Sequence, residues 1–188
     1  RALLILLPVV PGIGTPARYW RFGDENENTL LGGTRDDRLF GGGGDDILVG
    51  NEGNDYLEGG AGNDTLITGA DSDVLHGGTG DDEYVISLDA ARTTIRDTDG
   101  VGSISVVQSD GSRITLGGSV EVGASGYFED EDGNRYRRVG ADLNITLAGS
   151  GRTILIENFD TMPGAGLGID LQEPGDSTPT GRAIRAVS

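Results

Sequence analysis

Six aspartates recur at intervals of nine residues, and of all the side chains in this sequence they are the best suited to chemistry. They are Asp37, Asp46, Asp55, Asp64, Asp73 and Asp82, and Asn28 stands one interval earlier. Carboxylates at a regular spacing can supply the oxygen ligands that a hard divalent cation requires. Isolated Asp and Asn residues more often stabilise turns through local hydrogen bonds. The regular spacing favours a cation over turn chemistry alone.

The charge around these aspartates also favours a cation. Residues 23–85 hold sixteen Asp and Glu against Arg35 and Arg38, so this third of the chain carries −14 of the net charge of −17. So dense a block of like charge is ordinarily typical of disorder, and a folded state needs a counter-charge. The same acidity, together with the absence of lysine, excludes nucleic acid and anionic membrane surfaces as partners.

A nine-residue repeat positions the aspartates. From Gly23 onward the units read GDENENTLL, GGTRDDRLF, GGGGDDILV, GNEGNDYLE, GGAGNDTLI, TGADSDVLH and GGTGDDEYV. The sixth position carries the acid or Asn28, and the eighth carries leucine or, in the last unit, Tyr84. The first six residues predict a tight turn, because glycine supplies backbone conformations with positive φ. The last three predict a short strand whose central side chain points inward.

Two such units make one coil, so that units i and i+2 stack as parallel strands about 4.8 Å apart. One inward leucine per nine residues cannot offset a backbone entropy cost of roughly 1–2 kcal/mol per residue. Stacking also brings acids of adjacent turns together, where they repel unless a dication lies between them. Backbone carbonyls complete an all-oxygen cage, which suits calcium better than magnesium. The sequence therefore predicts a coil that needs calcium to fold.

The units resemble the GGxGxDxUx nonapeptide of the RTX (repeats-in-toxin, haemolysin-type) calcium-binding family. The resemblance implies an all-β fold, with a parallel β-roll, a calcium-binding solenoid, over residues 23–85. An antiparallel β extension that caps the roll is expected over residues 86–171. Residues 1–22 are interpreted as an N-terminal tail or the end of an upstream domain, and residues 172–188 as a linker or tail.

The resemblance also implies which residues hold calcium. One turn contributes its aspartate and the carbonyls of its second and fourth positions, and the next turn contributes its aspartate and the carbonyls of its first and third. Two implied sites join Gly42, Gly44 and Asp46 to Gly59, Ala61 and Asp64, and Gly60, Gly62 and Asp64 to Gly77, Thr79 and Asp82. Two more join Asn51, Gly53 and Asp55 to Thr68, Ala70 and Asp73, and Gly33, Arg35 and Asp37 to Gly50, Glu52 and Asp55. We expect about four ions, with three to five in range.

Several positions depart from the repeat, and several acids lie outside its sixth position. The first unit, with Asn28 and few glycines, is interpreted as a capping turn. Arg35 stands where positive φ is expected, which is uncommon for a bulky side chain. Exposed acids outside the sixth position are expected to be solvated rather than ligands; they are Asp36, Asp45, Asp81, Asp97, Asp99 and the run 129–132.

Beyond the repeats, residues 95–107, 113–116, 135–139, 143–147 and 153–159 predict strands joined by hairpin turns. The run from Asp132 to Leu171 is similar to the region that often follows RTX repeats in secreted bacterial proteins. Residues 2–10 are apolar but too short for a membrane span.

No catalytic group stands out. His76 is the sole histidine, cysteine and lysine are absent, and no G-x-S-x-G segment occurs. We therefore expect a module that is not an enzyme, in a parent protein whose activity, such as that of a protease, lipase, haemolysin or adhesin, resides in another domain.

The expected function is that of a calcium-binding module of a secreted bacterial protein. Family resemblance implies export by type I secretion machinery, folding in extracellular calcium, and support for the secretion and stability of a larger protein. The alternative is a calcium-dependent adhesion or carbohydrate- or ligand-binding module that uses residues 103–171. Exposed Trp or Tyr side chains clustered in a calcium-lined pocket would support it, but Trp20, Tyr127 and Tyr136 are too scattered in the sequence to indicate one.

Overall fold

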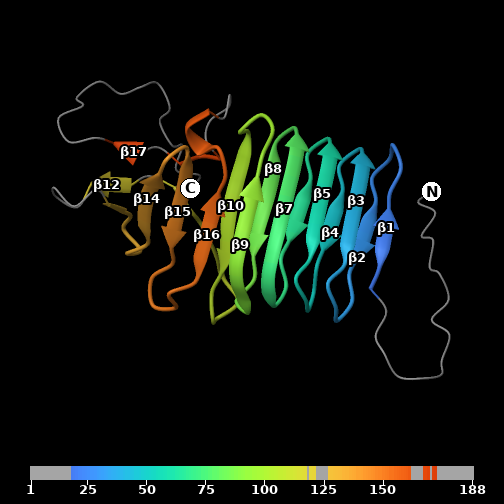
Figure 1. The fold of residues 1–188 in the computed structure, drawn as a ribbon, viewed down its shortest axis with the longest axis horizontal. Helices are drawn as coiled ribbons and strands as arrows, with labels where there is room; N and C mark the ends of the chain where they lie inside the picture. Colours follow the sequence, from blue (N-terminus) through green and yellow to red (C-terminus); the bar gives the residue numbers. More distant parts are fainter. Residues whose placement is uncertain (1–17, 118, 122–126, 162–166, 170, 173–188) are drawn as a thin grey trace.

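The computed structural model describes residues 18–117, 119–121, 127–161, 167–169 and 171–172. It is nearly all β, and its repeat region is a roll of stacked coils in which the chain alternates between two parallel sheets (Figure 1). The first sheet contains β1 (Trp20–Phe22), β3 (Arg38–Gly43), β5 (Tyr56–Ala61), β7 (Asp71–Thr79) and β9 (Ala90–Arg96). The second contains β2 (Thr29–Leu31), β4 (Ile47–Val49), β6 (Thr65–Ile67), β8 (Asp82–Ile86) and β10 (Gly102–Val107). The expected parallel β-roll is confirmed.

The register of the roll follows from the length of the unit. Each strand pairs in parallel with the strand two units later, so that Leu39 lies beside Leu57 and Leu48 beside Leu66. The eighth-position side chains Leu39, Leu48, Leu57, Leu66 and Leu75 are each 0 % exposed, and together they form the core between the sheets. The alternation of side chains along each short strand puts one leucine per unit inside and its two neighbours outside.

The stack continues past the last nonapeptide. Strand β9 pairs in parallel with β7, aligning Leu75 with Ile95, and β10 pairs in parallel with β8, aligning Tyr84 with Ile104. Residues 95–107, expected as one strand of an antiparallel extension, are instead two strands and an intervening turn of one more coil. The partners are twenty residues apart rather than eighteen because the segment before Ile95 is two residues longer.

A cap then closes one sheet. Strand β16 (Thr153–Ile156) pairs in parallel with β9, and antiparallel pairing continues outward through β15 (Asp142–Thr146), β14 (Arg135–Val139), β13 (Phe128–Glu129) and β12 (Ser119–Glu121). Strand β17 (Leu171–Gln172) pairs with β12, and β11 (Arg113–Thr115) closes the other sheet against β10. A short 3-10 helix spans Phe159–Thr161. The core of the cap consists of buried side chains continuous with the leucine core, among them Tyr136, Leu143, Ile145, Ile154 and Ile156.

Candidate metal centre

The sixth-position aspartates lie inside the turns rather than on the surface. Asp37, Asp46, Asp55, Asp64, Asp73 and Asp82 are each 1–2 % exposed. One carboxylate oxygen of each is held by the turn before it. The amide of Asp46 donates to Oδ1 of Asp64 at 2.8 Å, and the amide of Asp64 donates to Oδ1 of Asp82 at 2.9 Å. The amides of Tyr19, Asn28, Asp37 and Asp55 make the same bond to the aspartate eighteen residues later.

The second carboxylate oxygen of the sixth-position aspartates is not held by the preceding turn in the stack. Oδ2 of Asp46, Asp55, Asp64 and Asp82 is buried and has no hydrogen-bond partner within the described part of the chain. In the remaining two turns a glycine amide reaches it: Gly33 donates to Asp37 at 2.5 Å, and Gly69 donates to Asp73 at 3.2 Å. Burying a charged oxygen without a partner costs several kcal/mol, so the four orphaned oxygens fit a bound cation.

Glycine at the first position leaves space beside these oxygens. A Cβ on Gly41 would lie 2.3 Å from Oδ2 of Asp46 and 2.5 Å from the carbonyl oxygen of Gly59 in the next turn. On Gly59 and Gly77 a Cβ would lie 2.2 Å from Oδ2 of Asp64 and of Asp82 respectively. Only a residue without a Cβ keeps this space open, and carboxylate and carbonyl oxygens line it. These are the donors that calcium prefers.

The pKa shifts of the sixth-position aspartates agree with their burial. Burial raises the pKa of Asp46 and Asp73 to about 6 and that of Asp55 and Asp82 to about 7, and it also raises the pKa of Asp64. Nearby carboxylates add to the rise, since Asp64 raises the pKa of Asp46 and Asp73 raises that of Asp55. None of the ion pairs between described residues involves a sixth-position aspartate. The sixth-position carboxyls therefore have no arginine partner among the described residues.

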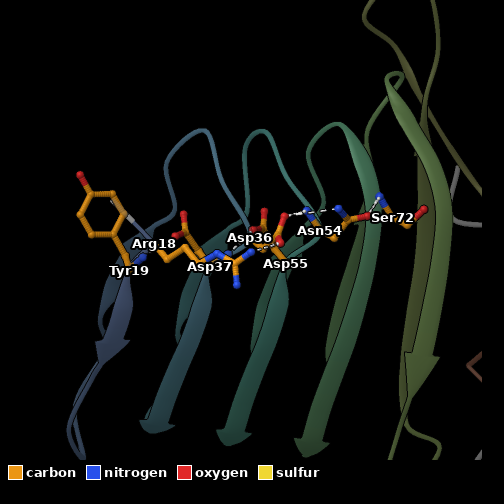
Figure 2. Close-up of polar contacts among 7 residues, drawn as sticks. All are labelled: Arg18, Tyr19, Asp36, Asp37, Asn54, Asp55 and Ser72. Carbon is orange, nitrogen blue, oxygen red and sulfur yellow. Dashed lines mark hydrogen bonds and ion pairs between the residues drawn. The ribbon is translucent and has the colours of Figure 1, made fainter. Parts of the chain in front are cut away.

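The fifth-position side chains form a second, outer ladder. Oδ1 of Asp36 accepts the amide of Asn54 at 3.1 Å, and Oδ1 of Asn54 accepts the amide of Ser72 at 3.3 Å. Arg18 closes this row with an ion pair to Asp36 at 2.8 Å (Figure 2). On the opposite edge of the roll, Asp45 accepts the amide of Asn63 in the same way. These side chains cross-link turns at the surface, whereas the sixth-position row lies inside.

The backbone positions expected to supply carbonyls stack in register. Gly42 pairs with Gly60, and Ala61 pairs with Thr79, across β3, β5 and β7. Positive φ occurs at Gly42, Gly44, Gly53, Gly60 and Gly62, and also at Asn51 and Asp71. Arg35 does not take positive φ, so the second turn differs from the others.

Hydrogen bonds between turns occupy one lone pair on several of these carbonyls. Those of Gly33, Asn51 and Thr79 accept the amides of Glu52, Ala70 and Gly62 respectively. The amides of Gly50 and Thr68 bond across to the neighbouring coil, and Gly77 donates to the hydroxyl of Tyr84. Gly41, which lies beside Oδ2 of Asp46, is not among the residues that the sequence predicts for a site, although its first position in the unit is a signal for it.

The described residues contain no group of three or more acidic or histidine side chains arranged for a metal ion. Nor does any helix among the described residues have the length and apolar character needed to cross a membrane.

Comparison with known proteins identifies the repeat. The family described as RTX calcium-binding nonapeptide repeat (4 copies) matches residues 22–57 and 49–84. Among curated proteins the comparison found no match. A solved structure that is similar is the solution structure of the AlgE6R3 subunit from the Azotobacter vinelandii mannuronan C5-epimerase. It is 21 % identical, covers 96 % of this chain and 96 % of that chain, and has a TM-score of 0.32.

Proposed function

We propose that residues 22–84, which match the RTX calcium-binding repeat, form a calcium-binding β-roll that serves as the calcium-folded module of a secreted bacterial protein. The observation that carries the proposal is the row of buried carboxylates with orphaned oxygens. A folded roll without a counter-ion holds these charges unpaired, so calcium binding supplies free energy of folding. The bound ion contributes positive charge, while the chain contributes the cage and the leucine core.

The proposed ligands pair turns that stack on each other. Four sites, each taking an aspartate and two carbonyls from each of two turns, account for about four ions. They are Gly42, Gly44 and Asp46 with Gly59, Ala61 and Asp64; Gly60, Gly62 and Asp64 with Gly77, Thr79 and Asp82; Asn51, Gly53 and Asp55 with Thr68, Ala70 and Asp73; and Gly33, Arg35 and Asp37 with Gly50, Glu52 and Asp55. Asp64 and Asp55 each serve two sites in this scheme.

Dependence on calcium suits export through type I secretion machinery. Where calcium is scarce, as inside the producing cell, charge repulsion keeps the repeats unfolded, and they fold in millimolar calcium outside. The extracellular module then supports the stability of the rest of the parent chain, which carries any catalytic activity. The sole histidine of the chain, His76, is on the outer side of the roll, where its ring Nε2 lies 3.2 Å from the hydroxyl of Thr98.

An adhesion or sugar-binding role is the second candidate, with support from one surface. Trp20 and Phe22 are each 64 % exposed, Phe22 stacks on Phe40 with ring centroids 5.0 Å apart, and Arg38 lies between Trp20 and Tyr56. This aromatic face is formed by side chains of β1, β3 and β5, outside residues 103–171, where the sequence predicts such binding. Tyr136 is buried and donates to Asp130 at 2.6 Å. Loss of glycan binding in Trp20→Ala on a glycan array would support this role.

Circular dichroism with and without chelator, combined with a calcium titration, tests the main proposal. We expect the chelated chain to lose most of its β signal and to regain it cooperatively on adding calcium. Asp64→Ala should weaken two sites and Asp37→Ala only one, so their losses of bound calcium should differ about two-fold. Equal β signal in both conditions would refute the folding switch, and equal losses would refute the pairing of turns.

A further inference from the structure

The turn beyond the last repeat stacks on the roll but lacks the repeat's acid. Pairing of β8 with β10 places Gly102 beside Asp82, and Gly102 has a φ of 148°. A Cβ there would lie 2.3 Å from the carbonyl oxygen of Asp82, so no side chain fits at the sixth position of this turn. Oδ2 of Asp82 nevertheless remains buried and without a partner.

A different carboxylate approaches from this turn. Asp97 occupies the place that the first-position glycine has in a repeat, because β7 and β9 align His76 with Arg96 just before it. Its Oδ2 accepts a hydrogen bond from the hydroxyl of Tyr84 at 2.5 Å, and that hydroxyl accepts the amide of Gly77 at 2.9 Å. A Cβ on Gly77 would lie 2.1 Å from the Tyr84 hydroxyl and 2.2 Å from Oδ2 of Asp82. The three oxygen groups therefore border one space.

The loop that carries Asp97 is held firmly in place. Oδ1 of Asp97 accepts the amides of Asp99 and Gly100, and Oδ2 of Asp99 accepts the amide of Gly80 in the turn below at 3.0 Å. The carbonyl of Val101 accepts the amide of Asp82 at 3.3 Å. Arg96, the nearest arginine in sequence, is engaged by Glu157 at 2.7 Å. Asp82 and Asp97 thus both lie beside the Tyr84 hydroxyl, and neither has an ion-pair partner among the described residues.

We propose that Asp82, Asp97 and the hydroxyl of Tyr84, together with backbone carbonyls of the two turns, form a further calcium site that joins the roll to its cap. This site does not follow the repeat: its second carboxylate comes from the first position of a non-repeat turn, and a phenol replaces the core leucine. Asp99 is a positioning residue that holds the loop against Gly80. The inference rests on the proposed calcium role of the repeats and extends it by one ion.

Asp97→Asn tests the site, because asparagine keeps the Oδ1 acceptor for the loop amides but loses the charge. The matched control is Asp110→Asn, which removes one charge from an exposed turn where Oδ1 accepts the amide of Ser112 at 2.9 Å. Native mass spectrometry or equilibrium dialysis counts ions on each full chain in saturating calcium. We expect Asp97→Asn to bind one ion fewer than wild type, with unchanged β content, and Asp110→Asn to bind the same number as wild type.

An unchanged ion count and unchanged calcium affinities in Asp97→Asn would overturn the proposal. The uncharged Tyr84 side chain would then only fill the space beside Asp82. If Asp97→Asn fails to fold, Tyr84→Phe decides, since phenylalanine resembles the leucine of other units. Terbium emission sensitised by the phenol should fall in Tyr84→Phe if an ion lies beside it, and unchanged emission would overturn the site. A wild-type chain that binds no calcium at all would instead refute the function proposed for the repeats.

Discussion

Acid should substitute for calcium in folding the roll. In the folded state burial raises the pKa of Asp55 and Asp82 from 3.8 to about 7 and that of Asp46 and Asp73 to about 6. Each pKa unit corresponds to about 1.4 kcal/mol, so ionising these four side chains at pH 7 costs about 3–4 kcal/mol each in the folded chain. Their sum is on the order of 10 kcal/mol, comparable to the whole stability of a typical domain.

The direction in which stability changes with pH follows from proton binding. Because the folded-state pKa values are raised, the folded chain binds more protons than the unfolded chain between about pH 4 and 7. The stability that these four side chains contribute to the calcium-free roll is therefore fully present below pH 3.8 and is lost as the pH rises through about 6 to 7. Calcium reverses this dependence, because it binds the ionised form and is displaced by protons.

The assay is circular dichroism of the chelated chain from pH 7.5 to 4.5, repeated for Asp55→Asn. We expect β signal to appear on acidification, and urea unfolding at pH 5 to give a roll more stable than at pH 7 by several kcal/mol. Asp55→Asn should fold at a higher pH without calcium, because one of the costly charges is gone. A chelated chain that stays unfolded at pH 5, or unfolds further, would refute the inference that buried carboxylates block folding.

Two further predictions concern the core and the turns, both measured by urea unfolding in saturating calcium. Leu66→Ala should cost about 2–4 kcal/mol, because Leu66 is 0 % exposed, whereas Ile47→Ala, at a position 43 % exposed, should cost under about 1 kcal/mol. Gly60→Ala should be far more destabilising than Gly111→Ala, although both have positive φ, because a Cβ on Gly60 would lie 2.1 Å from the carbonyl oxygen of Gly42 and one on Gly111 meets nothing within 4 Å. Equal costs within either pair would contradict the packing on which the prediction rests.

The repeat made most of the roll predictable. Seven units of equal length force the same turn and strand, so the pairing of Leu48 with Leu66 follows from counting eighteen residues. The coil formed by β9 and β10 could not be found in this way, because the insertion of two residues breaks the period. Ile95 and Ile104 still stand nine residues apart and keep the inward apolar positions, but the turn between them lacks the first-position glycine and the sixth-position acid, so the signal is too weak to recognise.

The candidate site was predictable in its composition but not in its detail. Spacing alone indicates that sixth-position acids stack, and chemistry indicates a hard cation between them. Spacing cannot show that one oxygen of each carboxylate binds an amide of the preceding turn in the stack, while the other oxygen has no partner in four of the six aspartates. Nor could it show that Asp97 turns toward Tyr84, since that contact depends on where the longer segment returns to the stack.

The two ends of the roll differ in how much apolar surface supports them. At the C-terminal end β9 pairs with β16, and the leucine core is continuous with the buried side chains of the cap, among them Tyr136, Ile154 and Ile156. At the β1 end of the described coil Trp20 and Phe22 remain 64 % exposed. A solenoid is stabilised by contacts between neighbouring coils, so a coil beside a well-packed cap needs less ion-binding free energy than one far from it. Calcium dependence should therefore rise from the cap toward the first units, and we expect folding of the roll to begin at the capped end, so that in a calcium titration followed by hydrogen exchange the amides of β8 and β10 gain protection before those of β2 and β3.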